Sequence, residues 1–166
     1  MDEITLGLIL FRYIPETALV VTLSLILTGY EAKLKTVTLI TVIGAPLIAV
    51  IRSFSLTPGV NTIIMLPVLI LLITFFCRIG ILSSSVASGL GLIIMGLTET
   101  VYTFCVTKLT GIEIKIILAD PILRLLVAVP EYIFLAIIII ICKRYHLVLI
   151  NIRELNEIRR INDYER

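Results

Sequence analysis

Long apolar segments separated by short polar breaks dominate the first 142 positions of the chain. A helix needs about 20 mostly apolar residues to cross a hydrocarbon core of about 30 Å. The strict alternation that marks a membrane β-barrel does not extend over a useful length of the sequence. The pattern therefore predicts five membrane-spanning helices, at Ile4–Thr28, Leu34–Ile51, Val60–Cys77, Ile81–Val106 and Pro121–Cys142.

The polar breaks carry residues that end and start helices. Gly29–Glu31 follows the first apolar segment, and Thr57–Gly59 precedes the third with a threonine for the N-cap and a proline at the first helical position. Asp120 and Pro121 repeat that arrangement before the fifth segment. These breaks separate the predicted helices from one another.

Composition and charge agree with a membrane bundle and add a tail. Hydrophobic residues make up 59% of the chain and charged residues 16%, whereas soluble domains carry about 25% charge. Six basic and four acidic residues fall within 143–166, so the whole net charge of +2 lies there. The sequence predicts an all-α protein: a transmembrane helix bundle at 1–143, then a cytoplasmic amphipathic helix at 144–166, where apolar side chains recur at Ile152, Leu155, Ile158 and Ile161.

The distribution of basic residues predicts the orientation. With five spans the two termini lie on opposite sides of the membrane, and the side rich in Lys and Arg is expected to be cytoplasmic. One side collects Lys33, Lys35, Arg78, Lys143, Arg144, Arg153, Arg159, Arg160 and Arg166, against Arg52, Lys108, Lys115 and Arg124 on the other. We therefore expect a multi-pass protein of the cell membrane with its N-terminus outside, its C-terminus in the cytoplasm and no secretory signal peptide.

Ionisable side chains inside the apolar segments mark a candidate ligand site. Each costs roughly 2.5–3.5 kcal/mol on insertion scales, so each needs a partner, a cavity or a route to water. Arg12 and Glu16 are four apart and can face each other on a helix, and Arg12 matches Glu99 in expected depth. A structural ion pair, an outer polar pocket and a proton or ion relay all remain open. The residues of the hypothetical pocket are Arg12, Glu16, Glu99, Tyr102, Arg124 and Glu131.

Small residues in the fourth segment indicate close helix packing. Residues four apart with small side chains allow two helix backbones to approach each other. The residues concerned are Ser84, Ser88, Gly89 and Gly91. Packing inside the bundle and packing between two copies of the chain both fit this spacing.

Little in the sequence points to catalysis. The three cysteines form no Cys-x-x-Cys motif, so neither a disulfide framework nor a metal site is expected. The only histidine, His146, stands four residues after Cys142, but a thiol protease needs the imidazole to be oriented by a third group. We expect no enzyme activity, no cofactor and no binding of nucleic acid.

The order of features resembles the N-terminal membrane region of peptide-sensing, quorum-sensing-type sensor histidine kinases of low-GC bacteria. The resemblance covers about residues 4–150 and is of low specificity, because its motifs are mostly leucine-rich spans with punctuation. It rests on residues 10–16 (Leu-Phe-Arg-Tyr-Ile-Pro-Glu), 30–35 (Tyr-Glu-Ala-Lys-Leu-Lys), Ile51-Arg52, 109–111 (Leu-Thr-Gly), 120–124 (Asp-Pro-Ile-Leu-Arg) and Pro130. It implies that the bundle senses an extracellular ligand, often a peptide, and passes the signal to a cytoplasmic helix. No kinase domain fits within 166 residues.

Three function classes follow. The first is a membrane sensor or interaction module with the outer pocket as its ligand site and the last span as its relay. The second is a small transporter, or the substrate-binding subunit of a larger importer, and the third is a structural or assembly subunit. The expected partners are membrane lipid, a second copy or another membrane subunit, and a cytoplasmic protein that contacts residues 144–166.

Overall fold

The computed structural model describes residues 12–53, 60–112, 116 and 121–151, and in these ranges the regular elements are all helices. The prediction of an all-α bundle is confirmed. The helices are α2 (Ile14–Leu27), α3 (Leu34–Ser53), α4 (Val60–Cys77), α5 (Ile81–Thr110) and α7 (Pro121–Arg144). Four of the predicted segments match these helices in place and order; the part of the first predicted segment before Arg12 lies outside the described residues.

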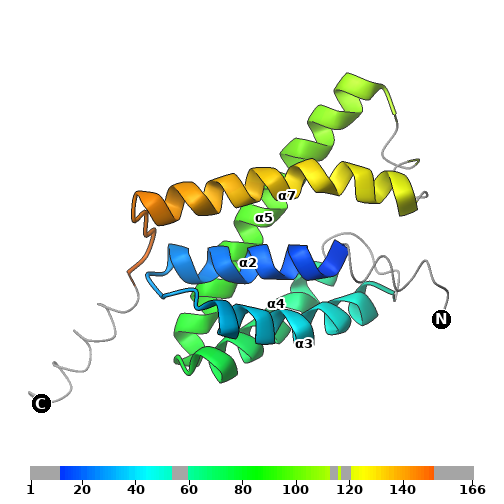
Figure 1. Ribbon diagram of the computed structural model, residues 1–166. Coiled ribbons are helices and arrows are strands. Elements are labelled where there is room, and N and C mark those ends of the chain that lie inside the picture. Colours follow the sequence, from blue (N-terminus) through cyan, green and yellow to red (C-terminus); the bar gives the residue numbers. More distant parts are fainter. Residues whose placement is uncertain (1–11, 54–59, 113–115, 117–120, 152–166) are drawn as a thin grey trace, which may run out of the picture.

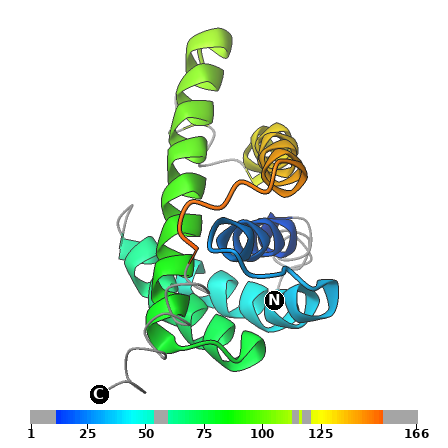
Figure 2. The same cartoon turned by 90° about the vertical axis from the view of Figure 1, so that its left-hand side faces the viewer.

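The central helix of the bundle is α2. It packs against α3, α5 and α7, while α4 packs against α3 and α5 (Figure 1 and Figure 2). Eight of its fourteen residues are buried, and Val21 and Ser24 have no exposed surface at all. A helix that is covered on several sides must be apolar around most of its circumference, and α2 has this composition.

Both ends of α2 follow from local sequence. Pro15 lies in the first turn, where a missing N–H costs no intrahelical hydrogen bond. At the other end, Gly29 adopts φ = 77°, and the Tyr30 N–H donates to the Leu25 carbonyl at 2.9 Å. This is the left-handed glycine cap that satisfies the last carbonyls of a helix. The predicted break at Gly29 therefore has a structural cause.

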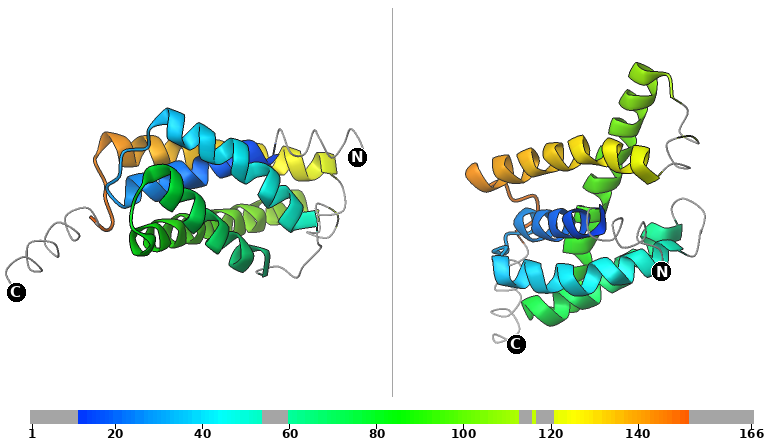
Figure 3. Two further views of the ribbon diagram at one scale, coloured as in Figure 1. Left: turned by 90° about the horizontal axis from the view of Figure 1, so that it is seen from below. Right: turned by 45° about the vertical axis from the view of Figure 1, so that its right-hand side comes forward.

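The longest helix, α5, runs obliquely across the others. Its 30 residues rise about 45 Å at about 1.5 Å each, which exceeds a hydrocarbon core of about 30 Å. Figure 1 shows α5 crossing α2 and α7 at a steep slope, and Figure 3 shows its last turns extending past α7. A tilted course is the usual way in which an overlong helix fits a membrane.

The outer surface of the bundle is strongly apolar. Leu109 is 86% exposed, Leu34 81% and Phe75 75%, and many other Leu, Ile and Val side chains are exposed along every helix except α2. Soluble proteins rarely expose large contiguous apolar patches. Hydroxyl side chains on the same helices bond to the carbonyl one turn earlier, as Thr100 does to Gly96 at 2.7 Å, so they need no water.

Three helices of the described chain are long and apolar enough to cross a membrane: Leu34–Ile51, Ile81–Thr110 and Leu125–Arg144. Two shorter apolar helices, Ile14–Leu27 and Ile63–Cys77, lie beside them in the bundle. Together with the exposed apolar surface, these lengths indicate a membrane protein. The five-span count of the sequence analysis remains a prediction.

Candidate functional site

Two sets of residues at opposite ends of the bundle are candidates for function. The first lies where α2 begins and contains three ionisable side chains that are almost completely buried. Arg12 is 6% exposed, Glu16 4% and Glu131 6%. We call these three residues the buried charged cluster, because Arg12 and Glu16 are four residues apart and Glu131 is next to Tyr132, whose hydroxyl bonds to the Arg12 carbonyl. Among apolar neighbours, such a cluster is stable only when its members are paired and hydrogen-bonded.

Glu131 reaches the cluster because of its position on α7. Ala128, Glu131, Leu135 and Cys142 are all buried, and their spacings of three, four and seven place them on one face of the helix. The helix packs mainly against α2 and also against α5. The sequence places a carboxylate on the same stripe as the apolar residues that hold α7 to the bundle.

A hydrogen bond joins α7 to the start of α2 at the buried charged cluster, and α5 lies close enough for an electrostatic influence. The Tyr132 hydroxyl donates to the Arg12 carbonyl at 3.1 Å, which ties α7 to the chain two residues before α2. Tyr102, on α5, lies within electrostatic reach of the Glu131 carboxylate. Arg12, Glu16 and Glu131 each interact with another group of the protein. The start of α2, the middle of α7 and the outer half of α5 therefore meet at one place.

Near the buried charged cluster the structure has a very small cavity and a larger apolar groove. Beside Glu16 there is a cavity of about 10 Å³, which is room for about one water molecule. Between α5 and α7 there is a groove of about 440 Å³, lined by Leu97, Thr98, Val101, Tyr102, Cys105 and Phe134. The groove is almost wholly apolar, and Tyr102 in its wall is influenced by the charge of Glu131. A ligand larger than water therefore has room in the groove but not in the cavity beside Glu16 that the described residues form.

One of the expected pocket residues, Glu99, does not join this arrangement. Glu99 is exposed, because the inward positions of α5 are Gly91, Met95 and Thr98, and residue 99 lies about 100° further around the helix. The expected match between Arg12 and Glu99 in depth therefore does not bring them together. Arg124 lies in the first turns of α7, and its side chain is outside the described part of the structure.

Three of the four small residues expected to pack on α5 are buried in the bundle. Ser84 and Ser88 have no exposed surface, and Gly91 is also buried. A Cβ added to Gly91 would collide with the Ser24 hydroxyl and would lie 3.2 Å from the Val20 carbonyl oxygen. Gly89 faces elsewhere, and a Cβ there would meet nothing within 4 Å. Ser84, Ser88 and Gly91 therefore fit packing inside the bundle rather than packing between two copies of the chain. Gly89 takes no part in the crossing of α2 and α5.

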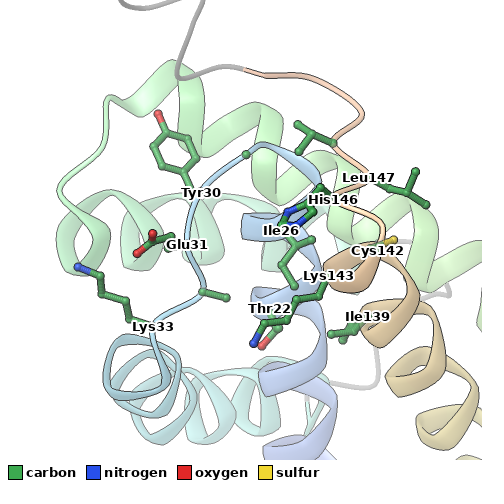
Figure 4. A pocket seen from close by; sticks show the side chains of 13 residues that line it. Thr22, Ile26, Tyr30, Glu31, Lys33, Ile139, Cys142, Lys143, His146 and Leu147 are labelled. Carbon is green, nitrogen blue, oxygen red and sulfur yellow. The ribbon is translucent and has the colours of Figure 1, made fainter.

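The second candidate lies at the opposite end, where basic residues flank three helix termini. Lys33 precedes α3, Arg78 follows α4, and Lys143 and Arg144 end α7. We call this the basic end of the bundle. A pocket of about 540 Å³ opens here between the end of α2, the α2–α3 connection and the end of α7 (Figure 4). Its lining includes Tyr30, Glu31, Lys33, Lys143 and His146.

The chain after α7 closes one side of this pocket. Leu147 N–H donates to the Cys142 carbonyl at 2.9 Å, and His146 adopts φ = 50°. This is a left-handed helix cap with histidine at the position that usually holds glycine. The N–H groups of Leu149 and Ile150 then donate to the Leu27 carbonyl at 2.9 and 3.2 Å, so the chain returns to the end of α2. We call residues 147–151 the return segment.

The prediction that the tail is helical from residue 144 onward is wrong for residues 145–151. The sequence analysis treated 144–166 as one amphipathic helix, but α7 ends at Arg144 and residues 145–151 form a turn and an irregular segment. The predicted helical stripe from Ile152 to Ile161 lies outside the described residues. The sequence analysis also missed the pocket at the basic end. The sequence did contain signals for it: Gly29 ends α2, Lys33 follows in the α2–α3 connection, and Lys143 lies at the end of α7.

The described part of the chain offers little for metal or thiol chemistry. Within it, no three His, Cys, Asp or Glu side chains lie close enough to hold a metal ion together. The thiols of Cys77, Cys105 and Cys142 are free, on three different helices. His146 and Cys142 both line the pocket at the basic end.

These features define an all-helical membrane bundle with charges buried between its helices at one end and a basic pocket at the other. Comparison with models of protein families, with curated proteins and with solved structures finds no match for this chain. Its function must therefore be argued from the two sites themselves.

Proposed function

We propose that the protein is a non-enzymatic membrane sensor or interaction module. An apolar or peptide ligand occupies the α5–α7 groove beside Tyr102 and Glu131, and α7 carries the change to the basic end. The observation that supports this most is the position of Glu131. It lies on the one buried face of α7 that also holds Cys142, whose carbonyl starts the cap before the return segment. In this proposal the N-terminus lies outside and the C-terminus in the cytoplasm.

The relay needs two arrangements of α7 against α2 with different affinities for the ligand, since a ligand shifts an equilibrium only by its differential affinity. A buried charged cluster suits such a switch. Its pairing depends on close geometry, so a small displacement of α7 carries a large change in interaction energy. An uncharged, fully apolar α2–α7 contact would tolerate the same displacement at lower cost.

The thiol of Cys142 gives a test of this function. In proteoliposomes of the Cys77→Ser/Cys105→Ser variant, Cys142 is the remaining cysteine and is 7% exposed. We expect a pool of hydrophobic synthetic peptides added outside to change the rate at which N-ethylmaleimide alkylates Cys142. Adding Glu131→Gln should abolish that response, whereas adding Glu99→Gln should preserve it. An alkylation rate that no peptide pool alters would contradict ligand sensing.

A second candidate, an assembly subunit, is favoured by the outer half of α5. Leu97, Val101 and Phe104 are each about 60% exposed there, and Glu99 is exposed on the same stretch. A carboxylate facing hydrocarbon is costly, so a covering helix with a polar donor would stabilise this surface. The sensor remains the leading proposal because it also accounts for the burial of Glu131.

A further inference from the structure

We propose that the pocket at the basic end binds the phosphate headgroup and the upper acyl chain of an anionic phospholipid. The inference does not depend on the sensor proposal, because it concerns the opposite end of the bundle. It rests on the chemistry of the pocket lining, on the way polarity changes with depth and on the backbone conformation of His146.

Polar groups surround the mouth of the pocket. Lys33 and Lys143 come from opposite walls, the α2–α3 connection and the end of α7, and both are exposed. The His146 imidazole adds a further hydrogen-bonding group beside the end of α7, whereas Figure 4 shows the Tyr30, Glu31 and Lys33 side chains extending from the other side of the α2–α3 connection. Lysine ammonium groups at the level of the headgroups are the usual partners of lipid phosphates. One acidic residue, Glu31, shares the mouth and weakens its attraction for anions.

The deeper walls of the pocket are apolar. Thr22 on α2 and Ile139 on α7 each lie seven residues from the mouth at Gly29 and His146, which is about 10 Å along a helix. Ile26 lies between these levels, and the Thr22 hydroxyl is already bonded to the Ala18 carbonyl at 2.7 Å. The pocket therefore passes from charged at the end of the helices to apolar toward their middle. A phospholipid likewise has a charged headgroup followed by an apolar acyl chain. A free phosphate ion would contact only the charged part of the pocket.

His146 is held at the mouth in an unusual conformation. A φ of 50° is costly for a residue with a Cβ, and helix caps of this kind usually have glycine. Strained positions of this sort concentrate at binding sites. Histidine at this position places a hydrogen-bonding ring beside Lys143, where glycine would place nothing.

Native mass spectrometry of the full chain in detergent tests the proposal, with dioleoylphosphatidylglycerol and dioleoylphosphatidylcholine as competing probes. We expect the wild-type chain to retain phosphatidylglycerol preferentially. Lys33→Gln/Lys143→Gln should weaken that binding about thirtyfold, since each of the two lysines near a lipid surface contributes about 1 kcal/mol. Lys35→Gln/Lys108→Gln removes the same charge outside the pocket and should leave binding nearly unchanged. Glu31→Gln should strengthen it.

Three results would overturn the assignment. Equal retention of the two lipids by the wild-type chain would show that the pocket does not select an anionic headgroup. Equal loss in the two double-lysine variants would show a general charge effect rather than a site. Displacement of phosphatidylglycerol by millimolar inorganic phosphate would show that the site binds free phosphate and not lipid. Circular dichroism of each variant confirms that the helices are intact.

Discussion

Replacing Gly91 with leucine is expected to destabilise the bundle more than any other single substitution on α5. The backbones of α2 and α5 meet at this point, and a Cβ at residue 91 would already collide with Ser24 and stand 3.2 Å from the Val20 carbonyl oxygen. Overpacking in a well-packed core typically costs about 1–3 kcal/mol, and a leucine against backbone exceeds that range. Thermal unfolding of the purified protein in detergent measures the loss.

Gly89→Leu provides the matched control, because it makes the same change two residues away where a Cβ meets nothing within 4 Å. It should change stability by no more than about 1 kcal/mol, since leucine is also the better helix former. A partial rescue is also expected: Ser24→Gly should recover part of the loss caused by Gly91→Ala. Equal effects of Gly89→Leu and Gly91→Leu would show that α2 and α5 do not cross as described.

Arg12→Met is expected to have the second-largest effect. The substitution removes the positive charge of the buried charged cluster and leaves the carboxylates of Glu16 and Glu131, which are 4% and 6% exposed. Breaking a buried set of charges by removing one member costs about 3–5 kcal/mol, because the remaining charge has lost its compensation. Methionine keeps most of the side-chain volume, so the loss reports charge rather than packing. Chemical unfolding in mixed detergent micelles measures it.

Neutralising Glu16 or Glu131 in the Arg12→Met background should restore part of the lost stability, since fewer uncompensated charges then remain buried. Glu99→Gln makes the same neutralisation at an exposed position of α5 and should leave the stability of Arg12→Met unchanged. If Arg12→Met alone were as stable as the wild-type chain, the three side chains would not form an interdependent cluster.

The number and order of the described helices could be predicted because they depend on local features. Apolar length sets each helix, and Gly29 ends α2 through its own left-handed conformation. The predicted bounds of Val60–Cys77 match α4, and the start of α5 at Ile81 also agrees. The end of α5 was placed too early, at Val106, because apolar length says nothing about how far a tilted helix extends beyond the hydrocarbon core.

The site could be predicted only in part. Arg12, Glu16 and Glu131 stand out because a charge in an apolar segment is costly, and all three are buried. That reasoning gives depth but not rotation about the helix axis, so it could not show that Glu99 faces outward while Arg12, Glu16 and Glu131 are buried. The pocket at the basic end depends on Leu149 and Ile150 returning to Leu27, a contact between distant parts of the sequence that no local pattern shows.

The two ends of the bundle are linked through the α2–α7 contact. Tyr132 bonds to Arg12 at one end of this contact, and the return segment bonds to Leu27 at the other. Between them, Leu135 is 1% exposed and contributes to the apolar core. A ligand that moves α7 relative to α2 at one end would therefore strain the hydrogen bonds at the other end. This coupling is the physical basis of the proposed relay.

Hydrogen exchange at Leu149 and Ile150 tests this linkage most directly, because both N–H groups donate to the Leu27 carbonyl at the far end from Glu131. The account predicts that Glu131→Gln, by weakening the α2–α7 contact, accelerates exchange at these two amides about tenfold, a loss of about 1.4 kcal/mol of local stability. Glu99→Gln should leave their exchange at the wild-type rate. Wild-type exchange at both amides in Glu131→Gln, in a protein with intact helices, would contradict the claim that α7 couples the two sites.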